Sequence, residues 1–195
     1  MGGLSLLAAV LLGKPASDAR RAGRIEKIRR LPDRQLMTEV WIPAFAREGG
    51  RILWVGCRAY TAPDYAALEA CGAEVWTTDI DPEAARWGMV NRHRTGDICA
   101  IDAVFRDLTF DAILCNGVFG YGVDTAADQK RAMAAMASIL KPSGRLLLGW
   151  NTDKTDDPLT PAITDGAFGP APFACRPSRT RFDSVTHVYD SVQRI

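Results

Sequence analysis

The stretch R-I-L-W-V-G-C-R-A-Y-T-A-P, from Arg51 to Pro63, decides the fold of this chain. Its apolar run predicts a buried strand, and Gly56 predicts a turn that leads into a helix. Turns of this kind that bind nucleotides carry several glycines and often an acid. Here Arg58 and Tyr60 stand where further glycines are expected, and Trp54 stands where the acid is expected.

The composition indicates one globular domain over residues 1–195. The chain has 47% hydrophobic and 24% charged residues, which is typical of a soluble protein with a full core. Its formal net charge of +1 gives no strong field to attract nucleic acid or an anionic membrane surface. We therefore expect a small-molecule substrate, with no nucleic acid and no membrane as partner.

Cysteine and histidine usage argues against a disulfide framework and a metal site. There are five cysteines, an odd number, with no C-x-x-C pair, and only two histidines, His93 and His187. Free cysteines in apolar runs act as small core residues. This pattern predicts a cytoplasmic protein without a bound metal. The cysteines are Cys57, Cys71, Cys99, Cys115 and Cys175.

Residues 1–48 are expected to form N-terminal helices. The apolar segment Leu4–Leu12 is too short to span a bilayer and no Lys or Arg precedes it, so we interpret it as a helix that contacts the domain or a second subunit. If this helix contacts a second subunit, the protein is a homodimer. Apolar spacing predicts a helix over Asp18–Arg30 and another over Gln35–Arg47, which Pro43 interrupts.

From Arg51 onwards, predicted strands and helices alternate, which indicates an α/β fold with a doubly wound, mostly parallel sheet. The predicted strands are Arg51–Val55, Glu74–Asp79, Arg92–Gly96, Phe110–Asn116, Arg145–Trp150, Arg181–Asp183 and Thr186–Val192. The predicted helices are Asp64–Cys71, Pro82–Asn91, Cys99–Asp107 and Asp124–Leu140. Residues 152–182, above all Asp153–Arg181, are rich in Pro, Gly, Asp and Thr, so they predict an irregular lid-like segment.

Ligands of such sheets bind at the carboxyl ends of the strands. Asp79 ends the second predicted strand, 23 residues beyond Gly56, and an acid there can accept hydrogen bonds from both ribose hydroxyls. The alternative role is a helix cap, for which Asp81 is better placed. Asp97 follows Gly96 and fits either the amine of adenine or a simple turn.

The order of these features resembles the class I S-adenosylmethionine-dependent methyltransferases. The resemblance rests on strand-Gly-x-x, strand-Asp, Gly-Asp-Ile, F-D-x-I-x-x-N and L-K-P-S-G-R-L-L-L, and it covers Ile52–Asn151, with Thr186–Tyr189 similar to the final strand. It implies a seven-stranded sheet and S-adenosylmethionine as cofactor. Dehydrogenases of related fold need a G-x-G-x-x-G turn to approach a pyrophosphate, and this chain lacks that turn.

The resemblance also assigns residues to parts of the cofactor. It implies that Gly56, with Cys57, lies against the methionyl part, Asp79 on the ribose, Ile80 against adenine, Asp97 and Ile98 at the adenine edge, and Asn116 beside the sulfonium. The Arg58 guanidinium is either a partner of the cofactor carboxylate or an ordinary surface group. Tyr60, Tyr65 and Tyr121 either line the mouth and attract the sulfonium or serve only in packing.

Candidates for the catalytic side follow the fourth and fifth strands. The loop N-G-V-F-G-Y-G, Asn116–Gly122, is expected to face the sulfonium and brings in Tyr121. Asn151 ends the fifth strand and either orients an acceptor or caps the strand. His187 begins the last strand and is either a general base or a structural histidine. The predicted catalytic residues are thus Asn116, Tyr121, Asn151 and His187.

Trp54 leaves the reaction open. The family's acid at this position engages the α-ammonium of the cofactor, so its loss, with Arg58 nearby, disfavours the charged amine. A neutral amine could attack its own γ-carbon and release methylthioadenosine, as in the similar enzymes that form azetidine-2-carboxylate. Methyl transfer to a small acceptor, this cyclisation, and cofactor binding without catalysis are the three alternatives.

Overall fold

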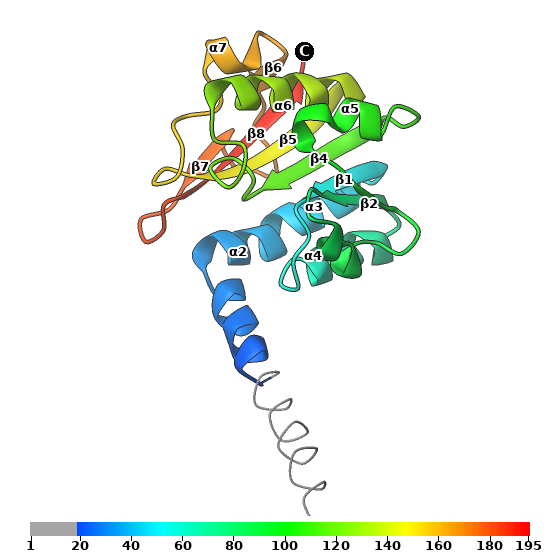
Figure 1. The fold of residues 1–195 in the computed structure, drawn as a ribbon. Coiled ribbons are helices and arrows are strands. Elements are labelled where there is room, and N and C mark those ends of the chain that lie inside the picture. Colours follow the sequence, from blue (N-terminus) through cyan, green and yellow to red (C-terminus); the bar gives the residue numbers. More distant parts are fainter. Residues whose placement is uncertain (1–18) are drawn as a thin grey trace, which may run out of the picture.

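The computed structural model describes residues 19–195, and Leu4–Leu12 lies outside them. The chain folds around one eight-stranded sheet, whose strands alternate with helices (Figure 1). The strands are β1 (Arg51–Val55), β2 (Glu74–Asp79), β3 (His93–Thr95), β4 (Phe110–Asn116), β5 (Leu140–Asn151), β6 (Phe168–Pro170), β7 (Arg179–Arg181) and β8 (His187–Arg194).

The sheet confirms the predicted mostly parallel α/β fold, with one difference in strand number. Its order is β3-β2-β1-β4-β5-β8-β6, and β1 to β5 run parallel while β8 runs antiparallel to β5. Seven strands were predicted, but β6 and β7 both pair with the outer edge of β8, at its two ends. The last sheet position is therefore shared by two short strands, because prolines and glycines interrupt the segment that supplies it.

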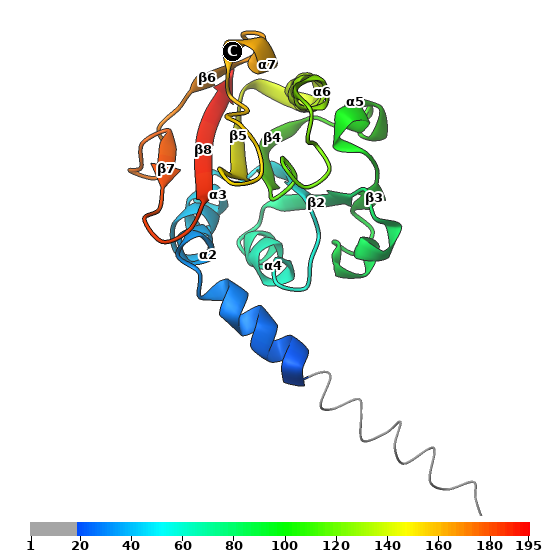
Figure 2. The same ribbon diagram turned by 60° about the vertical axis from the view of Figure 1, so that its left-hand side comes forward.

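Helices cover both faces of the sheet (Figures 1 and 2). One face carries a continuous helical stretch made of α2 (Pro32–Leu36), the π-helical η1 (Met37–Trp41) and α3 (Ile42–Glu48), together with α4 (Ala62–Ala70). The other face carries α5 (Ile101–Val104), α6 (Ala126–Ile139) and α7 (Pro161–Thr164). Two short 3-10 helices, η2 (Pro82–Trp87) and η3 (Ile98–Ala100), follow β2 and β3. Residues 19–29 form a helix that projects away from the sheet.

The alternation of side chains along each strand divides the core into two layers. In β1, Leu53 and Val55 face the layer under α6, whereas Ile52 and Trp54 face the layer under α3 and α4. All four side chains are buried. The central strand β1 is thus apolar on both faces, as a strand covered by helices on each side requires.

The structure changes several predicted boundaries. Strands β1, β2 and β4 coincide with their predictions, but the helix predicted over Pro82–Asn91 ends at Trp87. Gly88 follows in an extended conformation, and a Cβ there would meet the ring of His93 at 2.4 Å, so the backbone passes close to β3 at this point. The segment 152–182 is less irregular than predicted, since it contains α7, β6 and β7.

No helix in residues 19–195 is both long and apolar enough to cross a membrane.

Candidate active site

A cleft opens at the carboxyl ends of strands β1 to β4. This is the edge at which open α/β sheets bind ligands. The cleft collects most of the residues that the sequence singles out, although they come from four separate segments. Six of the nine predicted cofactor-binding residues line it, and so does Tyr121; the six are Gly56, Arg58, Asp79, Ile80, Asp97 and Ile98.

The turn after β1 needs only one glycine. Gly56 has a φ of +89°, a conformation that other residues rarely adopt, and its N–H donates to the Thr78 carbonyl at 2.9 Å. Within residues 51–63 it is the one position with a positive φ. Arg58 and Thr61 then close the turn by bonding each other through backbone and hydroxyl groups, at 3.0 Å in both directions. Arg58 and Tyr60 therefore replace glycines without backbone strain.

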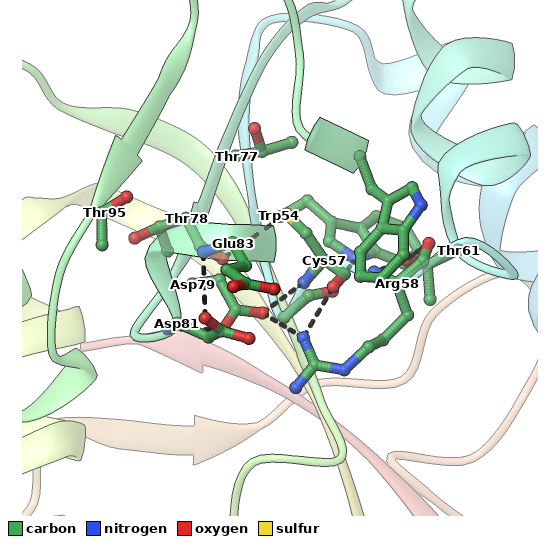
Figure 3. A network of polar contacts seen from close by, with 12 residues as sticks. Trp54, Cys57, Arg58, Thr61, Thr77, Thr78, Asp79, Asp81, Glu83 and Thr95 are labelled. Atoms are coloured by element: carbon green, nitrogen blue, oxygen red, sulfur yellow. Dashed lines mark hydrogen bonds and ion pairs between the residues drawn. The ribbon is translucent and has the colours of Figure 1, made fainter. Parts of the chain in front are cut away.

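Asp79 organises this turn (Figure 3). Its Oδ2 accepts the N–H of Cys57 at 2.8 Å and a guanidinium N–H of Arg58 at 2.6 Å. Its Oδ1 accepts the N–H of Asp81 at 3.0 Å. A carboxylate offers about four acceptor positions, so three are filled and one is free. Displacement of Arg58 would leave two, which is the number that the two hydroxyls of a ribose require.

Asp81, and not Asp79, caps the helix that follows β2. Its carboxylate accepts the N–H of Glu83 at 2.9 Å at the start of η2. Asp79 is only 5% exposed and is directed toward the turn after β1. The two acids of the D-I-D sequence thus have different roles, and the one on the cleft is the one predicted to bind ribose.

The far end of the cleft combines apolar and polar groups. Ile80 is 68% exposed and Ile98 is buried, so between them they offer an apolar surface. Asp97 accepts the N–H of Cys99 at 2.9 Å through Oδ1 and so caps η3. This bond leaves its other oxygen for a ligand, so the capping role and the predicted adenine contact do not exclude each other.

Trp54 braces the turn from the core side. Its indole is 1% exposed, packs edge-on against Tyr65 with ring centroids 5.4 Å apart, and donates to the Gly56 carbonyl at 3.1 Å. Trp54, which stands at the position of the family's acid, therefore stabilises the turn after β1 from the core side.

Three of the residues that the sequence singles out near the turn do not line the cleft. Cys57 is fully buried, and burial, together with the charge of Asp79, raises the pKa of its thiol to about 12, so it is no nucleophile at neutral pH. The ring of Tyr60 lies 5.1 Å from the guanidinium carbon of Arg34. Tyr65 was expected either to line the mouth or to serve only in packing, and the structure shows packing: it is buried against Trp54 and its hydroxyl donates to the Trp87 carbonyl.

Asn116, Asn151 and His187 meet beside the cleft, at the carboxyl ends of β4 and β5 and the start of β8. Asn116 donates to the hydroxyl of Tyr189 at 3.0 Å. Asn151 donates to Thr186 Oγ1 at 3.0 Å, and its oxygen lies 3.2 Å from Nδ1 of His187. Gly117, next to Asn116, lines the cleft, so this polar cluster adjoins it.

His187 is held neutral. Burial, and to a lesser extent the charge of Arg34, lower its pKa to about 3. A base with so low a pKa is poorly matched to proton abstraction near neutral pH. The position of His187 beside the cleft agrees with the prediction, but its environment favours accepting a hydrogen bond over removing a proton.

The sequence did not point to Arg34, Gly149 or Tyr189. Arg34 lies on α2, far from the strand ends in sequence, and Tyr189 is one of several aromatic residues in an apolar strand. Only the pairing of Gly149 with both Asn116 and Tyr189 reveals its position in the cluster. Among residues 19–195, no group of three or more His, Cys, Asp and Glu side chains is arranged to hold a metal ion.

Comparison with known proteins points to one family. Residues 53–148 match the family described as methyltransferase domain. No curated protein matches the sequence.

Solved structures of three bacterial methyltransferases share the fold. An S-adenosylmethionine-dependent methyltransferase from Clostridium acetobutylicum has a TM-score of 0.65 at 12% identity, over 91% of this chain and 99% of that chain. N-methyltransferase NodS from Bradyrhizobium japonicum, in complex with S-adenosyl-L-homocysteine, has a TM-score of 0.63 at 15% identity, over 86% and 90%. The 1,6-didemethyltoxoflavin-N1-methyltransferase from Burkholderia thailandensis has a TM-score of 0.58 at 17% identity, over 100% and 91%.

Proposed function

We propose, from the match of residues 53–148 to the methyltransferase domain family, that this protein is an S-adenosylmethionine-dependent enzyme that methylates a small molecule. The family match and the fold shared with methyltransferases that bind S-adenosylhomocysteine support S-adenosylmethionine as the cofactor. When bound, this cofactor supplies an electrophilic methyl group on a sulfonium. The chain's own residues have to bind it, orient it and exclude water.

The observation that carries the proposal is the relation of Asp79 to the turn after β1. The buried carboxylate faces the cleft, and Gly56 keeps the backbone of the turn close to the neighbouring strand end. Asp79 would hold the ribose hydroxyls, with Ile80 and Ile98 on either side of the adenine and Asp97 at its edge. The turn has no second or third glycine for a pyrophosphate, which disfavours a dinucleotide.

Arg58 would change partners when the cofactor binds. In this structure it neutralises Asp79 at 2.6 Å. The ribose needs the acceptor position that Arg58 fills, and the guanidinium is 47% exposed, so it can move. Its next partner would be the cofactor's carboxylate, in a charge-assisted pair. Tyr121, which is 55% exposed on the rim, would cover the methionyl part.

Cyclisation of the cofactor is a second candidate, which Trp54 favours. Trp54 stands where the family has a carboxylate that would hold the α-ammonium, and the adjacent Arg58 adds positive charge. Because a free α-amine titrates at about 7.7–8.0, a modest fall in its pKa leaves it largely neutral at pH 7.5. The amine nitrogen would bond the γ-carbon, the bond from that carbon to sulfur would break, methylthioadenosine would leave, and the nitrogen would lose a proton.

Product analysis separates these reactions. The full chain is incubated with S-adenosylmethionine, with and without a mixture of small amines, alcohols and thiols, and products are identified by mass spectrometry. Methyl transfer predicts S-adenosylhomocysteine only when an acceptor is present. Cyclisation predicts methylthioadenosine and azetidine-2-carboxylate without any acceptor. Cofactor binding without either product would overturn the enzymatic proposal and leave a binding module.

A further inference from the structure

A second groove lies at the same edge of the sheet as the cleft. Its walls are the segment that follows β5 and the first turns of α6, and its volume is about 570 Å³. Small-molecule sites commonly enclose about 300–1,000 Å³, so a ligand of that size has room here. We call it the acidic groove, because its lining includes four aspartates and one cation, Lys154. The aspartates are Asp124, Asp153, Asp156 and Asp157.

The acidic groove and the cleft share a wall, which is the loop of residues 117–124. Tyr121 of this loop lines the cleft, whereas Asp124 at its end lines the groove. The loop packs against the segment after β5, since a Cβ at Gly120 would lie 2.6 Å from the Cβ of Lys154. The groove is therefore directly beside the site proposed for the cofactor.

Only two of the four acids have a positively charged partner. Asp157 is paired with Arg179 at 2.6 Å, and Asp153 lies 3.6 Å from the one lysine of the groove. No Lys, Arg or His in the described part of the chain forms an ion pair with Asp124 or Asp156. The groove therefore keeps negative charge that the chain itself does not neutralise.

A buried amide also faces the acidic groove. Gln129 lines the groove although it is only 3% exposed. Its nitrogen donates to Thr155 Oγ1 at 2.7 Å and lies 3.5 Å from the Val123 carbonyl. Both contacts use the nitrogen, and no group in residues 19–195 donates to the oxygen. Buried polar groups usually have a partner, so this oxygen points to a ligand that donates a hydrogen bond.

The positions of the acids indicate which kind of cation fits. The four carboxylates do not converge on one point, since no group of three or more His, Cys, Asp and Glu side chains within residues 19–195 is arranged to hold a metal ion. Separate carboxylates match separate positive charges, and an amide oxygen matches an N–H donor. An organic molecule with several ammonium groups provides both.

We propose that the acidic groove binds the methyl acceptor, and that this acceptor is a small diamine or polyamine. The inference rests on the proposed methyl transfer. The carboxylates hold the ammonium groups at one end of the molecule, and Gln129 accepts one of their N–H groups. The other end passes the loop of residues 117–124 and presents its terminal amine to the cleft.

The transfer to such an amine balances without a protein base. The terminal amine, which lies beyond the acids, first gives its proton to water, because only a neutral nitrogen has a lone pair. This lone pair forms the N–C bond to the methyl carbon while the C–S bond breaks and its electrons pass to sulfur. The products are a methylammonium ion and S-adenosylhomocysteine. The ammonium groups in the groove keep their protons, since nearby carboxylates favour the charged form.

The first test compares ligands of different charge. The full chain is titrated calorimetrically with spermidine, putrescine, butylamine and Mg²⁺. We expect the two multiply charged amines to bind about tenfold more tightly than butylamine, with no displacement of spermidine by an equal concentration of Mg²⁺. Equal binding of butylamine, or displacement by Mg²⁺, would indicate only a negative surface and overturn the proposal.

Product analysis tests the role of the bound amine. With S-adenosylmethionine and spermidine, mass spectrometry should detect methylated spermidine and S-adenosylhomocysteine. Spermidine that binds without being methylated, while the cofactor also binds, would overturn its assignment as acceptor. A protein that does not bind the cofactor would instead overturn the proposed function.

Lys154→Gln tests the groove through a gain of affinity, which a misfolded protein would not show. The substitution removes the one positive charge of the lining and keeps the Cβ that packs against Gly120. The affinity for spermidine should rise about two- to fivefold. Unchanged or weaker binding in this variant would contradict the proposal.

The double variant Asp124→Asn and Asp156→Asn tests the acids that have no cationic partner. Both side chains are exposed, so the change removes charge without disturbing the core. Affinity for spermidine should fall about tenfold, while the Kd for S-adenosylhomocysteine changes less than about twofold. Asp102→Asn is the control, because Asp102 is an exposed acid on α5 that does not line the groove. Equal spermidine affinities in the control and the double variant would overturn the assignment.

Discussion

The guanidinium of Arg58 lies 2.6 Å from the carboxylate of Asp79, on the oxygen that also accepts the backbone N–H of Cys57. The residue that replaces a glycine in the turn is thus paired with the acid proposed to bind ribose. The Arg58 side chain is 47% exposed although Asp79 is buried, so a ligand can displace the guanidinium into solvent.

Arg58→Ala should affect two ligands in opposite directions. Adenosine needs Asp79 but has no carboxylate, so we expect its affinity to rise up to about fivefold when the competing guanidinium is removed. S-adenosylmethionine loses the proposed partner of its carboxylate, and its affinity should fall about tenfold. Calorimetric titration of wild type and variant with both ligands measures this. A parallel change for the two ligands would show that Arg58 does not exchange partners.

Asp79 and Asp81 provide a matched pair of substitutions. Asp79→Asn removes the charge that accepts the ribose hydroxyls and should weaken S-adenosylmethionine binding about 10- to 100-fold. Asp81→Asn alters the cap of η2 and should leave this affinity within about twofold, since an Asn can also cap a helix. Equal losses in the two variants would argue for a general effect on the loop after β2.

Trp54 should matter through one hydrogen bond. Trp54→Phe keeps most of the buried ring but removes the donor to the Gly56 carbonyl. We expect a free energy of unfolding about 1–2 kcal/mol lower and a several-fold weaker affinity for S-adenosylmethionine, because the turn is less well fixed. Trp76→Phe is the control, since its indole donates to Glu74, away from the cleft. Denaturant unfolding and calorimetry give the two quantities, and identical affinities in both variants would contradict the role given to Trp54.

Most of the fold could be predicted from the sequence because its signals are local. Strands β1, β2 and β4 are rich in β-branched, aromatic and other apolar residues and lead to a glycine, an acid or an asparagine, and their bounds coincide with the predicted ones. The length of the helix after Pro82 was not predicted correctly: it ends at Trp87, where the chain turns to pass close to His93 of the next strand. The two short strands on β8 likewise depend on pairing between distant segments.

The residues that line the cleft were predictable for the same reason, and the polar cluster beside the cleft was not. Gly56, Asp79 and Asp97 each stand at the end of a strand, so sequence spacing alone placed them on one edge. The cluster of Asn116, Gly149 and His187 forms only because three strands align these residues across the sheet. No sequence pattern marks such a register in advance.

His187 gives the stability a pH dependence with a defined sign. Its pKa is lowered from an ordinary value of 6.5 to about 3 in the folded protein, so between these values the unfolded chain binds a proton that the folded chain does not. Its contribution is therefore present above pH 6.5 and is lost as the pH falls, by up to about 1.4 kcal/mol per pH unit. In His187→Gln this loss should disappear.

Urea unfolding at pH 7.0 and pH 5.0 tests this prediction as a difference between the two proteins. Arg34 lies near His187 in both, and the buried carboxyls Asp33 and Asp64, whose pKa values burial raises, titrate alike in both. The wild type should lose more free energy of unfolding between the two pH values than the variant. Equal losses would mean that His187 takes up its proton while folded.

Calorimetric titration of the full chain with S-adenosylhomocysteine, beside Asp79→Asn, tests the central claim most directly. We expect one site per chain with a micromolar Kd. Asp79→Asn should weaken the affinity for S-adenosylhomocysteine at least tenfold while the variant stays folded. No binding to the wild type, or equal binding to both proteins, would contradict the assignment of the cleft between β1 and β4 as the cofactor site.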